Sequence, residues 1–190
     1  MKFMVESNSV CDTCALRLYN TKSYNLQGVG NPYFNNCIVV PNVDYKAYKA
    51  GAMSFSEQVK LIEQSIISST GGLLETTYIV PLIRCNEAIS CKIDDATFNK
   101  CLTYFIQDLK IFNFKHILLL GTAAQRLLKM SIEQAKNYVY RSPNNRFYSV
   151  NYSPLIKYVN DKLYEDFVDN LNVWYNSAMS NEYNKTIKQI

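Results

Sequence analysis

The chain has 190 residues, 48% of them hydrophobic and 13% aromatic, so it is long enough for one sizeable core and too short for two ordinary domains. Its net charge of +4 and its pI near 8.6 permit a phosphate-binding face, but they exclude the long basic tails of chains that bind nucleic acid by charge alone. No apolar run is long enough to cross a membrane, and the start has the pattern of neither a signal nor a transit peptide. We therefore expect one cytoplasmic domain over residues 1–180, a polar tail at 181–190, and no membrane partner.

Apolar runs that are typical of buried strands alternate along the chain with segments of helical spacing. In chain order, the sequence predicts a strand at 37–41, a helix at 53–68, a strand at 77–83, a helix at 95–111, a strand at 116–121, a helix at 122–139, a strand at 147–152 and a helix at 158–179. Helices between consecutive strands favour parallel pairing, because a parallel crossover needs about a dozen residues or more. The predicted fold is α/β, a three-layer α/β/α sandwich around a four-stranded parallel sheet.

The carboxyl ends of the predicted strands are the expected place for a functional site, because open parallel sheets bind their ligands there. These ends are residues 41–45, 84–86, 121–122 and 151–154. Although they are far apart in the sequence, a parallel sheet brings them to the same edge.

Four of the six cysteines have a spacing that suits a metal centre. Cys11 and Cys14 form a C-x2-C pair, which presents two thiolates from one tight turn. Cys85 and Cys101 lie at the end of the second predicted strand and within the next predicted helix, and could complete a four-thiolate site. Because the cytosol keeps thiols reduced, the six cysteines are better explained as metal ligands, nucleophiles or small core residues than as a disulfide framework. Cys37 opens an apolar strand and is expected to be a core residue.

Several segments resemble the iron–sulfur uracil-DNA glycosylases, usually called family 4. CDTCALRL is similar to that family's C-x-x-C-x-L, and GVGNP is similar to its G-x-G-N-P. TYIVPLIRC resembles Y-I-T-N-V-V-K-C, and FKHILLLGTAAQRLL resembles the strand-to-helix segment with L-G-x-x-A. The resemblance covers about residues 8–170. The abundance of Asn, Tyr, Lys and Ile is typical of an AT-rich genome, such as that of a phage or a low-GC bacterium.

The resemblance implies a [4Fe–4S] cluster. In family 4, cysteines in this order ligate one cluster, which lies away from the chemistry and orders loops near the DNA backbone. The implied ligands are Cys11, Cys14, Cys85 and Cys101. A Zn²⁺ ion on the same thiolates and the absence of any metal are the alternatives, since thiolate-only sites suit both kinds of centre. Cys91 is a candidate replacement for one of the ligands.

Uracil removal requires a flipped nucleotide, a grip on the base, a positioned water and a stabiliser for the departing uracil. In family 4 an acidic residue after the first strand acts on the water, and Asn42 stands at that position here. An amide can orient a water but cannot accept its proton. Asp44 is either a replacement carboxylate or a cap of the turn. Tyr45 either lines the base pocket or is an ordinary loop tyrosine.

Two further positions differ from the family. Its uracil-reading Asn aligns with Pro81, which has no amide to offer the base, and the His of its H-P-S-x-L motif aligns with Asn151. The chain has one histidine, His116, which opens the third predicted strand at the end of the sheet opposite to the expected site. Because the loss of one electrostatic stabiliser costs about two to three orders of magnitude in rate, we expect weak or no excision.

DNA binding does not require the catalytic groups, because contacts to the DNA backbone need only hydrogen-bond donors and positive charge. Ser153 and Lys157 follow the fourth predicted strand, where the family contacts a phosphate, and Arg84 follows the second. Arg141 and Arg146 are expected to extend the same face, although each cation alone can also be a solvated surface charge.

We interpret the chain as a divergent, DNA-binding relative of family 4 with a role in DNA repair or replication. The expected ligand is single-stranded or uracil-containing DNA, and a replication protein is a candidate partner. A phage origin would place the protein in the host cytoplasm. One alternative is an active glycosylase, a hydrolase of the N-glycosidic bond with a rebuilt site at Asn42, Asp44 and Asn151. The other is a protein-interaction module, such as a polymerase subunit or an inhibitor.

Overall fold

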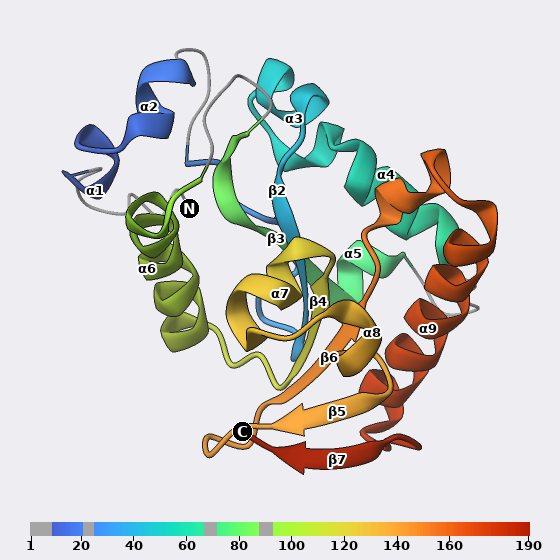
Figure 1. Ribbon diagram of the computed structural model, residues 1–190. Coiled ribbons are helices and arrows are strands. Elements are labelled where there is room, and N and C mark those ends of the chain that lie inside the picture. Colours follow the sequence, from blue (N-terminus) through green and yellow to red (C-terminus); the bar gives the residue numbers. More distant parts are fainter. Residues whose placement is uncertain (1–8, 21–24, 67–71, 88–92) are drawn as a thin grey trace.

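The structure, a computed structural model, describes residues 9–20, 25–66, 72–87 and 93–190 (Figure 1). The helices are α1 (Ser9–Asp12), α2 (Ala15–Tyr19), α3 (Tyr45–Ala50), α4 (Glu57–Ser65), α5 (Leu73–Thr76), α6 (Asp95–Ile111), α7 (Thr122–Leu128), α8 (Ile132–Ala135) and α9 (Asp161–Ser180), with 3₁₀ turns η1 (Met53–Phe55) and η2 (Pro154–Tyr158). The strands are β1 (Val29–Gly30), β2 (Asn36–Val43), β3 (Thr77–Asn86), β4 (His116–Leu120), β5 (Tyr138–Arg141), β6 (Phe147–Asn151) and β7 (Thr186–Gln189). None of the described helices is long and apolar enough to span a membrane.

The protein is α/β, but its sheet is larger than the sequence predicts. The four predicted strands are β2, β3, β4 and β6, and each pairs in parallel with its neighbour in the order β3-β2-β4-β6. The prediction of a four-stranded parallel sheet is nevertheless wrong, because β1 pairs antiparallel with β3, β5 pairs antiparallel with β6, and β7 joins β5. The described strands thus form one mixed, seven-stranded sheet.

The order of the parallel strands defines a switch point. From β2 the chain goes to β3 on one side, and it then returns to place β4 and β6 on the other side. In doubly wound sheets the crevice at such a reversal, outside the carboxyl ends of the strands, is where ligands bind. In this protein that reversal of strand order lies between β2 and β4.

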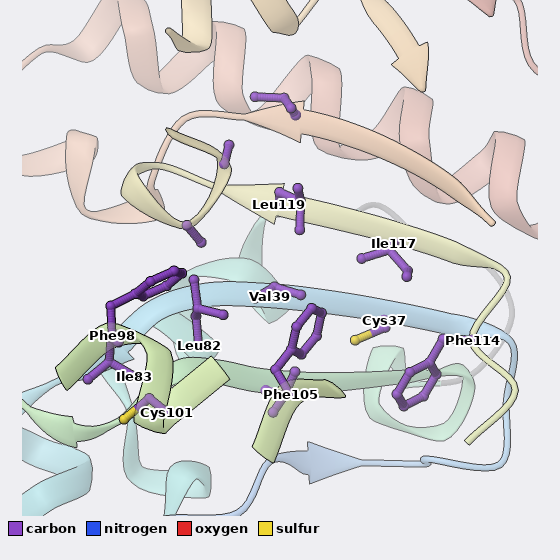
Figure 2. Packing of buried hydrophobic residues seen from close by; sticks show 14 of the residues in the cluster. Cys37, Val39, Leu82, Ile83, Phe98, Cys101, Phe105, Phe114, Ile117 and Leu119 are labelled. Atoms are coloured by element: carbon purple, nitrogen blue, oxygen red, sulfur yellow. The ribbon is translucent and has the colours of Figure 1, made fainter. Parts of the chain in front are cut away.

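Helices cover both faces of the sheet, because successive side chains of its buried strands point to opposite sides. Cys37 and Val39 of β2 pack with residues of α6 and α7, whereas Ile38 and Val40 pack with residues of α4 and α9. Figure 2 shows the first of these clusters, in which Cys37 lies close to aromatic rings. Cys37 is completely buried, which agrees with its predicted place in the core.

The helix predictions succeed best where end signals are strong. Helix α6 occupies residues 95–111 as predicted, and Asp94 caps it by accepting a hydrogen bond from the backbone N–H of Thr97 at 2.7 Å. The single helix predicted at 122–139 is wrong. Lys129 takes a left-handed conformation that ends α7, and Ser131 then starts α8 with a capping box.

The segment 181–190, which the sequence predicts as a polar tail, contains a strand. Asn181 ends α9 in a left-handed conformation, and β7 pairs in parallel with β5, with Ile187 opposite Val139. All four residues of β7 are exposed, so no apolar pattern marks the strand in the sequence.

Candidate metal centre and carboxyl edge of the sheet

The four cysteines with metal-ligand spacing come together in the folded chain. Cys11 and Cys14 flank a turn in which the N–H of Cys14 donates to the carbonyl of Cys11 at 3.0 Å. Cys85 is near the end of β3, and Cys101 lies in the second turn of α6. All four line one small cavity of about 10 Å³ and are only 5–8% exposed.

Burial makes Cys11, Cys85 and Cys101 hard to ionise. It raises the pKa of Cys85 to about 12 and that of Cys101 to about 11, and the other thiols of the group add to both shifts. The pKa of Cys11 is raised for the same reasons, although a hydrogen bond with Tyr104 opposes the shift. A cation among the four sulfurs would reverse this preference, because metal binding displaces thiol protons.

The lining of the thiol cavity also contains three cations. Arg17, Arg84 and Lys100 line it, and among the described residues no carboxylate does. Tyr104 also lines it, with its hydroxyl 3.1 Å from the sulfur of Cys11. A centre with four thiolate ligands carries net negative charge, so this lining suits such a centre.

Polar contacts hold the amino-terminal cysteine segment against the rest of the fold. The ammonium group of Lys100 donates to the side-chain oxygen of Thr13 at 3.1 Å and also to its carbonyl. The amide of Asn20 donates to the carbonyl of Asn86 at 3.2 Å and accepts from its N–H at 2.8 Å. The segment is thereby tied to α6 and to the end of β3.

Sequence reasoning missed Tyr104, Lys100 and Asn20 as supports of the thiol group. Helical spacing would have found Tyr104, because a residue three positions after Cys101 lies on the same face of α6. Asn20 and Lys100 carry no such signal, since their partners are distant in the sequence.

Within the described residues, no three His, Cys, Asp or Glu side chains are arranged to hold a single metal ion. Cys91, the candidate replacement ligand, lies outside the described residues. One ion requires sulfurs at about 2.3 Å from a common centre. A four-iron cluster separates its thiolates more widely, because each binds a different iron of the cube.

Arg84 does not lie where a phosphate could reach it. The sequence suggests a DNA contact, but the side chain is 3% exposed and forms an ion pair with Asp108 of α6. Burial raises the pKa of the Asp108 carboxyl, and the guanidinium of Arg84 opposes that shift. The role of Arg84 in this structure is to link β3 to α6 beside the thiols.

The switch point brings together several of the predicted carboxyl-edge residues. Gly121, which follows β4, has φ of +53°, and a Cβ atom there would lie 3.0 Å from that of Ser153 and 3.5 Å from Pro41. Asn42 lies one residue past Pro41, and its carbonyl accepts a hydrogen bond from the Gln58 amide at 3.0 Å. The ends of β2, β4 and β6 are therefore in close contact.

Asp44 is engaged in capping. Its carboxylate accepts from the N–H of Ala47 at 3.0 Å and from that of Gln58 at 3.3 Å, and it also accepts from the hydroxyl of Ser56. These contacts begin α3 and fasten the start of α4. Each carboxylate oxygen already has a partner, so the structure favours the cap over a general base.

Asn151 is likewise committed to the fold. It is fully buried, its amide donates to the carbonyl of Phe167 at 2.9 Å, and its oxygen accepts from the N–H of Tyr152 at 2.8 Å. Pro81 lies inside β3, opposite Val40 of β2. Neither side chain has a free group to offer a base.

Exposed aromatic and basic side chains gather at the same edge. Tyr45 is 58% exposed and Tyr158 is 64% exposed. Glu57 of α4 connects the regions around these two tyrosines. It pairs with Lys46, which follows Tyr45, and it accepts a hydrogen bond from the Tyr158 hydroxyl at 2.6 Å. Lys157 is exposed next to Tyr158. Tyr45 and Lys157 therefore belong to one surface, together with Ser153, which begins η2 by capping the N–H of Leu155.

The opposite end of the sheet holds the residues that do not join this surface. Arg146 directly precedes β6, and its guanidinium donates to the carbonyls of Leu109 and Phe114. The expectation that Arg141 and Arg146 extend the DNA face is wrong, because both lie at the amino end of β6. His116 is there too, buried, as expected from its place in the sequence.

No model of a known protein family matches the chain, and no curated protein matches it either.

Proposed function

We propose that this protein is a DNA-binding relative of the family 4 uracil-DNA glycosylases, with a [4Fe–4S] cluster and with weak or no uracil excision. It would act in DNA repair or replication. The observation that carries the proposal is the convergence of Cys11, Cys14, Cys85 and Cys101 on one cavity. The central parallel strands, with helices on both faces, support the three-layer sandwich of that superfamily.

The donor set fits a thiolate-bound centre. Four thiols from three separate parts of the chain meet here, and the neighbouring thiols add to the raised pKa of Cys85 and of Cys101, a cost that a bound cation would offset. The cavity of about 10 Å³ is smaller than a four-iron cube, so cluster binding requires the thiols to separate. The cluster would supply a structural crosslink between α1, β3 and α6.

The carboxyl edge supports binding of single-stranded DNA. Proteins of this kind combine cations that follow the backbone with exposed aromatic rings on which bases stack. Tyr45, Tyr158 and Lys157 provide both features on neighbouring elements. Ser153 begins the 3₁₀ turn that carries Lys157 and Tyr158, and it lies close to Gly121. The thiol group lies at the same end of the sheet, because Cys85 is near the end of β3.

The same edge argues against efficient excision. Asp44 caps a helix, and Asn151 is bonded to backbone groups through both ends of its amide. The described part of the edge has no histidine to stabilise a departing uracil anion, since His116 lies at the other end of β4. Excision without a general base and an anion stabiliser would be slow by several orders of magnitude.

The test is a single-turnover excision assay on a single-stranded uracil oligonucleotide, with binding to the same oligonucleotide measured over a range of salt concentrations. We expect binding that weakens steeply with salt, because each phosphate contact releases counterions. We expect no excision above background. Lys157→Glu should weaken binding and lower the salt slope by about 0.7 to 1. Arg141→Glu, the same charge change at the opposite end of the sheet, should leave both unchanged.

Each other outcome has a definite meaning. Excision that is abolished by Asn42→Ala would show that the pocket has been rebuilt, and it would contradict the proposal. Absence of both binding and excision would favour a protein-interaction module. Equal effects of Lys157→Glu and Arg141→Glu would show that DNA is held by diffuse charge and not by the carboxyl edge.

A further inference from the structure

The hydroxyl of Tyr104 lies against one of the four thiols. Tyr104 is in α6, three residues after Cys101, and its oxygen is 3.1 Å from the sulfur of Cys11. Tyr104 is 5% exposed and Cys11 is 8% exposed, so the contact is largely shielded from water. Because a hydrogen bond is electrostatically stronger where the local dielectric is low, this one acts on the sulfur more strongly than a surface contact would.

Metal binding would fix the direction of this hydrogen bond. Between a thiol and a hydroxyl, either atom can be the donor. A cysteine that ligates a metal has lost its proton, so its sulfur can only accept. The hydroxyl of Tyr104 must then be the donor, and a bond to a charged acceptor is stronger than one between neutral groups.

Two backbone groups act on other sulfurs of the thiol group in the same sense. The N–H groups of Asn25 and Arg84 form hydrogen bonds with Cys85 and Cys101, respectively, and both bonds favour the thiolate. Hydrogen-bond donors therefore face three of the sulfurs, as expected where negative charge lies on sulfur. Tyr104 is the one side chain among these three donors, so a substitution can remove its hydrogen bond alone.

The side chain of Arg84 holds the ring of Tyr104 in place. Its guanidinium carbon lies 5.2 Å from the centroid of that ring, and the same group donates to the carbonyl of Tyr104 at 3.5 Å. Asp108, one turn further along α6, pairs with the guanidinium. Partners that fix the groups around a metal ligand keep their geometry constant, so the hydroxyl keeps its position at Cys11.

We propose that Tyr104 raises the reduction potential of the centre held by the four cysteines, by donating its hydroxyl to the sulfur of Cys11. The inference rests on the proposed function, because it requires the iron–sulfur cluster. A reduced cluster carries one more negative charge than an oxidised one, so a donor to its sulfur stabilises the reduced form more strongly. Tyr104 acts through Cys11 and is therefore a positioning residue, not a ligand.

The test compares the midpoint potentials of iron-loaded wild-type protein and Tyr104→Phe in anaerobic redox titrations. This variant removes the hydroxyl and keeps the ring that lies beside Arg84. We expect its potential to be more negative than that of the wild type. Loss of a partner of a metal ligand typically changes an equilibrium by about tenfold or more. For a one-electron couple, a tenfold change corresponds to about 59 mV.

A second variant should shift the potential in the opposite direction. Replacement of Tyr104 by 3-fluorotyrosine keeps the hydroxyl and makes it more acidic, so that it becomes a stronger hydrogen-bond donor. We expect a potential less negative than that of the wild type. A purely structural role of Tyr104 does not predict opposite shifts for the two variants. This variant also tests the hydrogen bond if Tyr104→Phe does not retain iron.

Tyr175→Phe is the matched control. Tyr175 is also buried, and its hydroxyl forms a hydrogen bond with that of Thr76 at 2.9 Å. It belongs to α9 and does not line the thiol cavity. The control therefore loses a tyrosine hydroxyl and a hydrogen bond of the same kind, but away from the cysteines. It should keep the iron content and the midpoint potential of the wild type.

The outcomes separate this inference from the proposed function. Wild-type protein without iron would contradict both. Iron-loaded wild-type protein whose potential is unchanged by Tyr104→Phe would overturn the role of Tyr104 and leave the cluster assignment standing. An equal shift in Tyr175→Phe, or shifts of the same sign in the Phe and fluorotyrosine variants at position 104, would likewise contradict the hydrogen bond to Cys11 as the cause.

Discussion

The environment of single side chains decides which polar groups of this protein are available for chemistry. The sequence offers Asp44 and Asn151 as candidate catalytic groups, yet both side chains are engaged in hydrogen bonds with the backbone. Arg84 is basic but buried, and it serves an internal carboxylate. Residue type alone therefore suggests more reactive side chains at the carboxyl edge than their hydrogen bonding and burial allow.

His116 should make folding stability depend on pH. Burial lowers its pKa from 6.5 to about 4, and the neighbouring charge of Lys115 adds to this shift. Because the unfolded chain then binds more protons between these two values, the folded state loses stability as the pH falls through this window. We expect a loss of about 2 kcal/mol between about pH 7 and pH 5 in urea unfolding. His116→Phe should remove that part of the dependence, and equal pH profiles for both proteins would contradict the assignment.

Asp108 should be more important to stability than an exposed partner in an ion pair. Asp108→Asn leaves the guanidinium of Arg84 buried without a counter-charge, which costs about 3 to 5 kcal/mol. Glu87→Gln is the control, because Glu87 and Arg126 are both partly exposed and their pair is worth less than about 1 kcal/mol. Chemical unfolding of the two variants measures the difference. Similar losses of unfolding free energy in the two variants would mean that water reaches Arg84.

At the scale of elements, the junction between β4 and α7 packs closely against the residues that follow β6. Gly121 combines φ of +53° with ψ of −131°, a backbone conformation that residues other than glycine rarely adopt. Its position also leaves little room beside Ser153. The close approach of the strand ends therefore depends on this glycine.

Gly121→Ala should destabilise the protein by about 1 to 3 kcal/mol. The added Cβ would meet Ser153 at 3.0 Å. Gly72→Ala is the matched control, because that position has negative φ and no atom within 4 Å of an added Cβ. It should change stability by less than about 0.5 kcal/mol. A small effect at Gly121 in thermal or urea unfolding would show that the junction relaxes easily.

The four central strands could be predicted because their apolar runs are nearly continuous, as in strands that are buried on both faces. The edge strands could not be predicted. Strand β1 has two residues and β7 is fully exposed, so their pairing depends on contacts that no local pattern encodes. The single helix predicted over residues 122–139 is wrong for a different reason, because Lys129 ends α7 in a left-handed conformation and Ser131 caps a second helix within the same apolar spacing.

For the candidate site, the sequence predicts which cysteines come together better than it predicts what the neighbouring basic side chains do. The C-x2-C spacing of Cys11 and Cys14, together with the segments that resemble family 4, predicts that these two cysteines meet Cys85 and Cys101, and all four line one cavity. The burial of Arg84 and the amino-end position of Arg146 needed the tertiary structure, because each depends on a distant partner.

At the scale of the whole molecule, three regions are arranged around the sheet. The carboxyl ends of β2, β4 and β6 form the proposed DNA edge, and the end of β3 carries the thiols beside it. Helix α6 carries Tyr104 to the thiol group, to which it also contributes Cys101. On another side it carries Leu102 and Leu109, which line an apolar groove between α6 and α7. A cluster would therefore brace the end of the sheet where DNA is proposed to bind.

The most direct test of the central claim is the metal and sulfide content of protein purified without oxygen. We expect about four irons and four sulfides per chain, with broad absorbance near about 400 nm. Cys85→Ser should lose most of the iron, whereas Cys37→Ala, a change at a buried cysteine outside the thiol group, should keep it. Colourless wild-type protein, whether it holds one zinc ion per chain or no metal, would contradict the assignment.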